Sequence, residues 1–145
     1  MRNRAGIILI EEDKLALIER HRQGLHYFAF PGGGIDEGES AKQAAIREAE
    51  EELGIVVAIQ HKAAEIIFKK SKQIYFLVKR IGGEFGTGSG EEYGEYDPAH
   101  GTYLPIWMPL EDVLNKNVVP HMLAEFVVRS HREGWKKESV VMIEA

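Results

Sequence analysis

The sequence predicts a mixed α/β sandwich, of the α/β or the α+β class. Short apolar runs rich in Ile, Val, Phe and Tyr recur along the chain and predict β-strands. Two other segments, 41–53 and His121–Arg132, have the apolar spacing of helices. The length of 145 residues fits one domain, residues 1–145.

The amino-acid composition and the net charge exclude several classes of protein function. The chain is 44% apolar and 28% charged, as is typical of globular proteins. Its net charge of -5 argues against a general affinity for nucleic acid, because a protein that binds the phosphate backbone is expected to have a basic surface. The absence of cysteine excludes disulfides, thiolate nucleophiles and cysteine zinc sites. The apolar run near the N-terminus is too short for a signal or a membrane span, so we expect a cytoplasmic protein without a membrane partner.

The strands follow from the positions of the apolar runs. The first two are separated by a short polar stretch and predict a hairpin, and the fourth is expected to break near His61 and Lys62. Pro31 and the glycines at 32–34 predict a sharp loop after the third run. The predicted strands are Ala5–Ile10, Leu15–Ile18, Tyr27–Phe30, Val56–Phe68, Gln73–Val78 and Leu104–Met108.

The helices have recognisable ends. Ser40 is the expected N-cap of the first helix, Gln43 completes a capping box and Gly54 is the expected C-cap. A short helical turn is expected over 109–114. The inward-facing residues of the C-terminal helix are expected to be Met122, Leu123 and Phe126.

Residues 82–101 differ in composition from the rest of the chain. They include seven glycines and five carboxylates, and a loop of this length inside a compact domain is usually functional or disordered. We expect it to close over a substrate as a lid.

The first helix has two distinct faces. At about 100° per residue, Ala49 and Leu53 fall close to Ile46 and give a narrow apolar stripe, whereas Glu50 points elsewhere. Acidic residues at the spacing i, i+3, i+4 share an adjoining face: Glu48, Glu51 and Glu52. Three carboxylates so close raise one another's pKa, and hard oxygen ligands at this density suit Mg²⁺ or Mn²⁺. A solvated acidic face is the alternative that the helical wheel alone leaves open.

The glycines before this helix favour a ligand site. Backbone groups at 32–34 can approach a ligand closely, with carbonyls as hard ligands and amides as phosphate donors. Arg47 lies four residues before Glu51, where it either forms a surface ion pair or orients a metal-binding carboxylate. The glycine loop and the acidic helix together predict a site for cations and phosphate.

Gly33, Glu39 and the run Arg47–Ile55 resemble the signature of the Nudix hydrolases, which is G, five residues, E, seven residues, REUXEEXGU, where U is a bulky apolar residue. Only Ala49 departs, because the family usually has a larger apolar residue there. Two further segments also resemble the family: Phe30–Gly33 and Trp107–Leu110. The resemblance implies that the whole chain is a Nudix-type α/β/α sandwich around a mixed sheet.

The resemblance also implies the chemistry, which is hydrolysis of a nucleoside diphosphate linked to another group, with Mg²⁺ or Mn²⁺ as cofactor. Arg47 would orient a carboxylate, and Glu39 would help to fix the loop. The general base in the family is either a glutamate of the signature or one from a distant loop, and here we favour Glu92 over Glu91 and Glu95. The implied metal ligands are the carbonyl of Gly32 and the carboxylates of Glu48, Glu51 and Glu52.

Contacts to a nucleotide are expected around the glycine loop. Arg20 belongs to a basic stretch that could bind phosphate, and Phe28 could stack on a base. The other expected substrate-binding residues are Gly33, Gly34 and Glu39.

The substrate itself is inferred by elimination within the family. The proline that marks the usual ADP-ribose pattern is absent 15 to 20 positions after the signature. We therefore favour a nucleoside triphosphate, oxidised or otherwise modified, that is cleaved to the monophosphate. The alternatives are a pyrophosphatase for ADP-ribose, nucleotide sugars or dinucleotides, and a non-catalytic nucleotide-binding regulator. Dimers are frequent in the family, which leaves a homodimer open.

Overall fold

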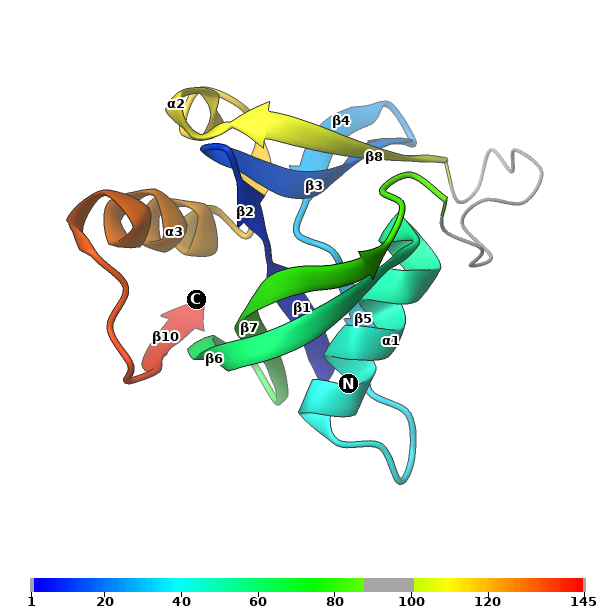
Figure 1. Cartoon of the computed structure of the whole chain (residues 1–145), viewed down its shortest axis with the longest axis vertical. Helices are drawn as coiled ribbons and strands as arrows, with labels where there is room; N and C mark the ends of the chain where they lie inside the picture. The colour runs from blue at the N-terminus through cyan, green and yellow to red at the C-terminus, as the bar shows by residue number, and fades with distance from the viewer. Residues whose placement is uncertain (1, 88–100, 145) are drawn as a thin grey trace.

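A mixed β-sheet forms the centre of the molecule and has a helix on each side (Figure 1). The computed structural model describes residues 2–87 and 101–144. In the order of the sheet the described strands are β10 (Val140–Glu144), β6 (Ile55–Phe68), β7 (Ser71–Gly83), β1 (Arg4–Ile8) and β5 (Gly32–Gly34). β1 runs parallel to β7 and antiparallel to β5, and β10 runs parallel to β6. The mixed α/β sandwich is thereby confirmed.

A second sheet is built around β3. The chain leaves the first sheet after β1 and enters the second through the short strand β2. β3 pairs antiparallel with β2, β4 and β8, and β4 pairs in parallel with β9. The described strands of this sheet are β2 (Ile10–Glu11), β3 (Lys14–Arg22), β4 (Leu25–Ala29), β8 (Thr102–Pro109) and β9 (Val118–Val119).

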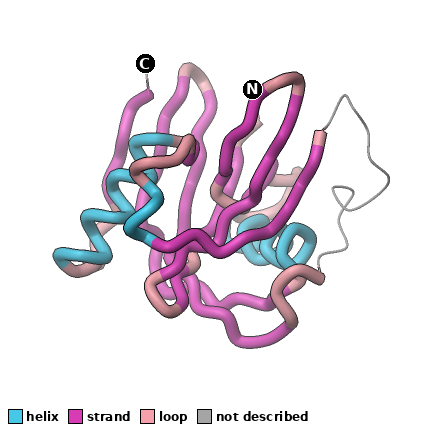
Figure 2. The backbone as a smooth tube through the Cα atoms, turned by 90° about the horizontal axis from the view of Figure 1, so that it is seen from above, coloured by secondary structure: helices cyan, strands magenta, loops and turns pink. Residues whose placement is uncertain are grey.

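Two helices, α1 (Ala41–Leu53) and α3 (His121–Glu133), lie on opposite sides of the first sheet, as the view from above also shows (Figure 2). The described helices are α1 (Ala41–Leu53), α2 (Leu110–Val113) and α3 (His121–Glu133). α1 begins with the predicted capping box, in which Ser40 Oγ accepts from the Gln43 amide at 3.1 Å and Gln43 Oε1 accepts from the Ser40 amide at 2.8 Å. It ends at Gly54, whose φ of 78° is left-handed and therefore suits glycine.

The apolar core has two layers, because successive side chains of a strand alternate between the side of α1 and the side of α3. Ile7 and Ile18 face a cluster with the alanines of α1, whereas Ile8 and Leu17 face a cluster with α3. Successive side chains of a strand point to opposite faces, so one run of aliphatic residues fills both layers. This arrangement fixes α1 against β1, β5 and β6.

Several elements differ from the sequence prediction. The glycines at 32–34 form strand β5 rather than a loop, because their bare backbone can approach β1 closely. The predicted break near His61 is a pair of register shifts inside a continuous β6. In α3, Leu123 is fully buried while Met122 and Phe126 are partly buried, so its inward face is centred on Leu123 and Val127. β9 and β10 were not predicted.

The glycine-rich segment is partly strand. β7 extends through Gly83, and the Gly86 amide then donates to the carbonyl of Leu53 at the end of α1, at 2.8 Å. Residues 88–100 lie outside the described part of the chain, so the predicted lid is not described. Within residues 2–87 and 101–144, no helix has the length and apolar character needed to cross a membrane.

Candidate active site

The acidic face of α1 points into the molecule. Glu48 and Glu52 are only 8% and 6% exposed, Glu51 is half-buried, and Glu50 is exposed. Ile46, the expected centre of the apolar stripe, is only half-buried. The buried face of α1 therefore includes two acids beside its alanines, which is not the environment of a solvated acidic face.

Strand β5 supports these two carboxylates. The amide of Gly32 donates a hydrogen bond of 2.7 Å to Glu52 Oε1. Gly33 lies so close to Glu48 that a Cβ atom at this position would overlap the Glu48 carboxylate. The glycines thus determine where the acids of α1 lie, and the missing side chain of Gly33 makes room for Glu48.

Arg47 connects the loop before α1 to the acidic face. Its Nε and Nη2 donate to the two oxygens of Glu39 at 2.8 and 3.0 Å, in a bidentate pair. Nη1 contacts Glu48 at 3.0 Å and Glu51 at 3.2 Å. Nη2 also donates to the carbonyl of Gly34 at 3.0 Å. Arg47 therefore positions carboxylates, whereas a surface ion pair would not make these additional bonds.

The pKa values in this cluster reflect the same contacts. The hydrogen bonds from Arg47, followed by one from the Asp36 amide, lower the pKa of Glu39 from 4.5 to about 2. The bond to Glu39 is also the largest cause that raises the pKa of Arg47 above its ordinary value. Glu39 and Arg47 are accordingly a charged pair throughout the physiological range of pH.

A cavity of about 300 Å³ opens beside the buried acids. Glu48 and Glu52 line it together with three arginines from β1 and β3: Arg4, Arg20 and Arg22. Phe30 and Tyr103 complete its aromatic part. A cavity lined by both carboxylates and guanidinium groups can hold a cation and an anion together.

Arg20 is the best-fixed of these arginines. It is 8% exposed, its Nε donates to the Thr102 carbonyl at 2.9 Å, and its guanidinium lies 3.6 Å from the ring centroid of Tyr103.

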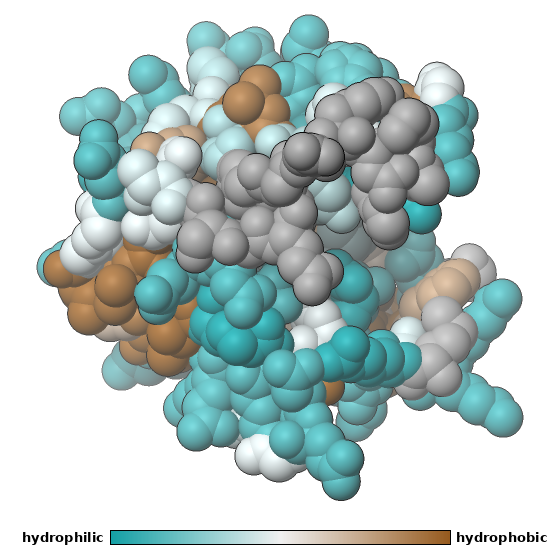
Figure 3. Space-filling model, turned by 90° about the vertical axis from the view of Figure 1, so that its right-hand side faces the viewer, coloured by the Kyte–Doolittle hydropathy of each residue, from teal (hydrophilic) through white to brown (hydrophobic). Residues whose placement is uncertain are grey.

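The surface on the side of the molecule where α1 lies is largely hydrophilic in its lower half (Figure 3).

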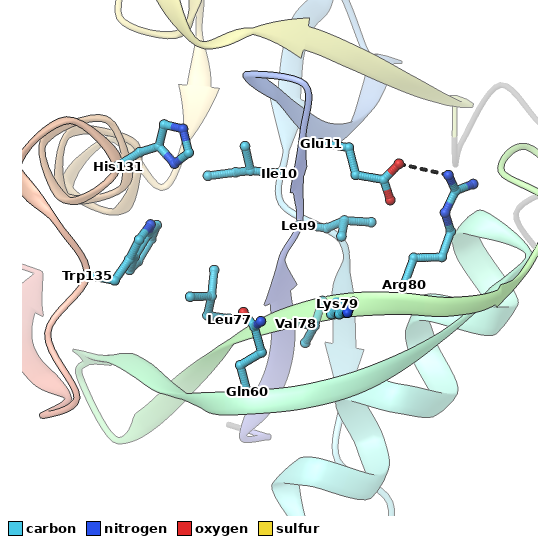
Figure 4. A pocket seen from close by; sticks show the side chains of 10 residues that line it. All are labelled: Leu9, Ile10, Glu11, Gln60, Leu77, Val78, Lys79, Arg80, His131 and Trp135. Atoms are coloured by element: carbon cyan, nitrogen blue, oxygen red, sulfur yellow. Dashed lines mark hydrogen bonds and ion pairs between the residues drawn. The ribbon is translucent and has the colours of Figure 1, made fainter.

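A larger cavity of about 480 Å³ lies elsewhere, next to α3 where the chain leaves the first sheet (Figure 4). Its lining includes Trp135, His131 and the ion pair between Glu11 and Arg80, 2.8 Å long. None of its lining residues belongs to α1. The cavity beside the acids is the candidate active site for that reason.

Not every predicted site residue reaches this cavity. Phe28 is buried in the core cluster on the α3 side and does not line the cavity, so its ring is placed for packing instead of base stacking. Glu39 and Gly34 bind Arg47 and act on the site through it. Glu92 lies outside the described residues.

Sequence analysis did not single out Arg4 and Tyr103 as site residues. Arg4 Nη2 lies 3.4 Å from the Gly32 carbonyl, the group expected to be a metal ligand. Tyr103 reaches the cavity through the pairing of β8 with β3, where it lies opposite Arg20. The basic stretch around Arg20 was predicted from the sequence, whereas no local pattern indicated that Arg4 and Tyr103 would join it.

Comparison with known proteins points to one family. A family profile described as the NUDIX domain matches residues 1–127. The RNA pyrophosphohydrolase of Teredinibacter turnerae is 27% identical to this chain, in a match that covers 87% of this chain and 85% of that protein.

Solved structures show the same fold. A Nudix hydrolase from Nitrosomonas europaea superimposes with a TM-score of 0.74 at 16% identity, over 99% of this chain and 79% of its own. An ADP-ribose pyrophosphatase from Streptococcus suis gives a TM-score of 0.68 at 20% identity, over 97% of this chain and 98% of its own.

The family match and the pyrophosphohydrolase relative place the chain in the class of hydrolases of pyrophosphate bonds. The chain belongs to the Nudix family.

Proposed function

We propose that this protein hydrolyses a P–O–P bond of a small nucleotide, with Mg²⁺ or Mn²⁺ as cofactor. The supporting observation is the cavity of about 300 Å³ that is lined by Glu48 and Glu52 together with three arginines. A nucleoside triphosphate, oxidised or otherwise modified, remains the favoured substrate, and the nucleoside monophosphate and pyrophosphate would be the products.

The residues fit a divalent cation. Carboxylate and carbonyl oxygens are the ligands that Mg²⁺ and Mn²⁺ prefer, and Glu48, Glu51, Glu52 and the Gly32 carbonyl would hold the ions. When bound, such ions neutralise phosphate oxygens and lower the pKa of water. The protein's own contribution is to fix the acids, through Gly32 and Arg47.

The arginines would bind the phosphate chain. Arg20 and Arg22 project from one face of β3 into the cavity, and guanidinium groups bind phosphate oxygens through paired hydrogen bonds. Attack of water on a phosphorus atom then breaks the bridging P–O bond, and the departing phosphate takes the electron pair. Tyr103 offers aromatic surface to the nucleoside.

A general base must accept the proton of the attacking water. Glu92 remains our proposal for this role, with Glu91 and Glu95 as the neighbouring alternatives. Full turnover by Glu92→Gln in the assay below would exclude it.

RNA is the second candidate substrate, because the relative from Teredinibacter turnerae is named an RNA pyrophosphohydrolase. The net charge of -5 argues against it, since long RNA is bound mainly through its phosphates. The structure from Streptococcus suis, named an ADP-ribose pyrophosphatase, adds ADP-ribose to the compounds that need testing.

The test is a substrate panel with excess Mg²⁺ or Mn²⁺, in which release of phosphate and pyrophosphate is followed. The panel contains ordinary and oxidised nucleoside triphosphates, ADP-ribose, a dinucleoside polyphosphate and a 5′-triphosphate RNA. We expect Glu52→Gln to lower kcat by at least about 100-fold, because it removes a negative charge that would help to hold the cation that neutralises the phosphate oxygens. Gln can still accept the Gly32 hydrogen bond, so the fold should remain intact.

Glu50→Gln is the matched control, since Glu50 is exposed on the same helix. It removes the same charge and should leave turnover unchanged. Cleavage of no compound in the panel, or wild-type turnover by Glu52→Gln, would contradict the proposed function.

A further inference from the structure

Three metal-ligating side chains meet on the β3–β4 hairpin, on a different surface from the acidic face. They are Glu19, His21 and His26, and one ligand atom from each lies within 4.8 Å of the other two. We propose that these residues form a binding site for a transition-metal ion of the Zn²⁺, Co²⁺ or Ni²⁺ type.

The pairing of the strands places the three residues together. His21 lies directly opposite His26 in the antiparallel pair, and Glu19 lies two residues before His21 on the same face. The hairpin turn consists of Gln23 and Gly24, which both have positive φ, as two-residue hairpin turns require. The hairpin thus places the three ligands close together before an ion binds, so that binding costs little chain entropy.

The side chains already contact one another. His26 Nε2 lies 2.7 Å from Glu19 Oε2, and the rings of His21 and His26 stack with centroids 4.1 Å apart. In a tetrahedral zinc site with bonds of about 2.0 to 2.1 Å, neighbouring donor atoms are roughly 3.4 Å apart. Small rotations of the rings would bring the three donors to this spacing.

Thr102 gives His21 a partner of the kind that metal-binding histidines have. His21 Nδ1 lies 3.5 Å from Thr102 Oγ1, which can accept a hydrogen bond from this nitrogen. A histidine that donates through one nitrogen is oriented to bind metal through the other. Thr102 would thus fix the ring that presents Nε2 to the ion.

The ligand types distinguish this site from the proposed Mg²⁺ site. Two imidazoles and one carboxylate suit Zn²⁺, Co²⁺ or Ni²⁺, whereas Mg²⁺ prefers oxygen ligands alone. Both histidines are exposed and the Glu19 side chain is 23% exposed, so an ion can reach them from solvent. Three protein ligands leave the fourth position of a tetrahedral site for water.

The position of the site links it to the substrate cavity. Glu19 and His21 point to one face of β3, while Arg20 and Arg22 point to the other and line the cavity. An ion that joins β3 to β4 would hold the strand that carries these arginines. This proposal requires no hydrolytic activity and stands whether or not the proposed function is correct.

The experiment is a calorimetric titration of the full chain with Zn²⁺ in excess Mg²⁺, which occupies oxygen-ligand sites. We expect His21→Gln and His26→Gln to weaken Zn²⁺ binding by roughly 10- to 100-fold. His121→Gln is the matched control, since His121 is exposed at the start of α3, and it should bind Zn²⁺ like wild type. Addition of Co²⁺ should broaden the ring NMR signals of His21 and His26 and leave that of His121 sharp.

Two outcomes would overturn the proposal. One is equal Zn²⁺ affinity in wild type, His21→Gln and His26→Gln. The other is loss of Zn²⁺ binding in Glu52→Gln, which would assign the ion to the acidic face. The inference predicts instead that Glu52→Gln keeps Zn²⁺ bound at the hairpin even where hydrolysis is lost.

Discussion

Gly33 faces the carboxylate of Glu48 so closely that the two positions have to be considered together. A Cβ atom at Gly33 would overlap Glu48, which is the flexible end of a side chain and can move aside. At Gly32, a Cβ atom would meet the backbone of β1 instead, 2.6 Å from the Ala5 carbonyl oxygen. Backbone cannot move without disturbing the sheet, so the two neighbouring glycines serve different purposes.

Gly33→Ala should therefore damage activity more than stability. Displacement of the Glu48 carboxylate by about 1 Å is expected to lower kcat by roughly 100-fold, whereas the melting temperature should change little. Gly32→Ala should show the reverse order, with a clear fall in melting temperature because β5 loses its close pairing with β1. Parallel measurements of kcat and of thermal unfolding test this, and a Gly33→Ala protein with full activity would contradict it.

The loop before α1 and the helix itself are joined by the pair of Glu39 and Arg47. Local signals predicted the helix correctly, since the capping box, the C-cap and the acidic spacing each depend on residues within one or two turns. The bonds from Arg47 to Glu39 and Gly34 span eight and thirteen residues, so helical spacing could not show them. The resemblance to the family did indicate that Arg47 orients a carboxylate, and the contact with Glu48 agrees with it.

Glu39→Gln should change how stability depends on pH. The folded protein holds the pKa of Glu39 at about 2, below the ordinary value of 4.5, so its ionised form stabilises the fold. This contribution is fully present above about pH 4.5 and is lost as pH falls toward 2, because the unfolded chain binds the proton first. The melting temperature of wild type should therefore fall more steeply over this range of pH than that of Glu39→Gln.

Glu50→Gln serves again as the control for this measurement, because Glu50 is an exposed acid of α1. The melting temperature of Glu50→Gln should depend on pH in the same way as that of wild type, from neutral to acidic pH. Parallel curves for wild type and Glu39→Gln would show that the pair with Arg47 contributes nothing to stability.

At the scale of the molecule, the sequence indicated the class of fold but not its sheet topology. The first sheet joins β10 to β6 in parallel, although about 70 residues separate them along the chain, and no local pattern encodes such a pairing. The same is true of β8, which brings Tyr103 beside Arg20. The contact between Tyr103 and Arg20 therefore could not be found from the sequence, whereas the acidic part of the cavity lies on one helix and the basic stretch around Arg20 on one strand, so both could be predicted.

The distribution of charge over the molecule leads to the last prediction. A net charge of -5 repels an anionic substrate at long range, and three arginines of the cavity have to offset it locally. Arg22 is exposed, and its replacement by Gln should raise KM by roughly fivefold, corresponding to about 1 kcal/mol, with kcat nearly unchanged. The increase should shrink at high salt, because exposed charges are screened. Arg132→Gln removes the same charge from α3, away from the cavity, and should leave KM unaltered. Equal KM values for the two variants would mean that net charge, and not the arginines of the cavity, governs binding of the substrate.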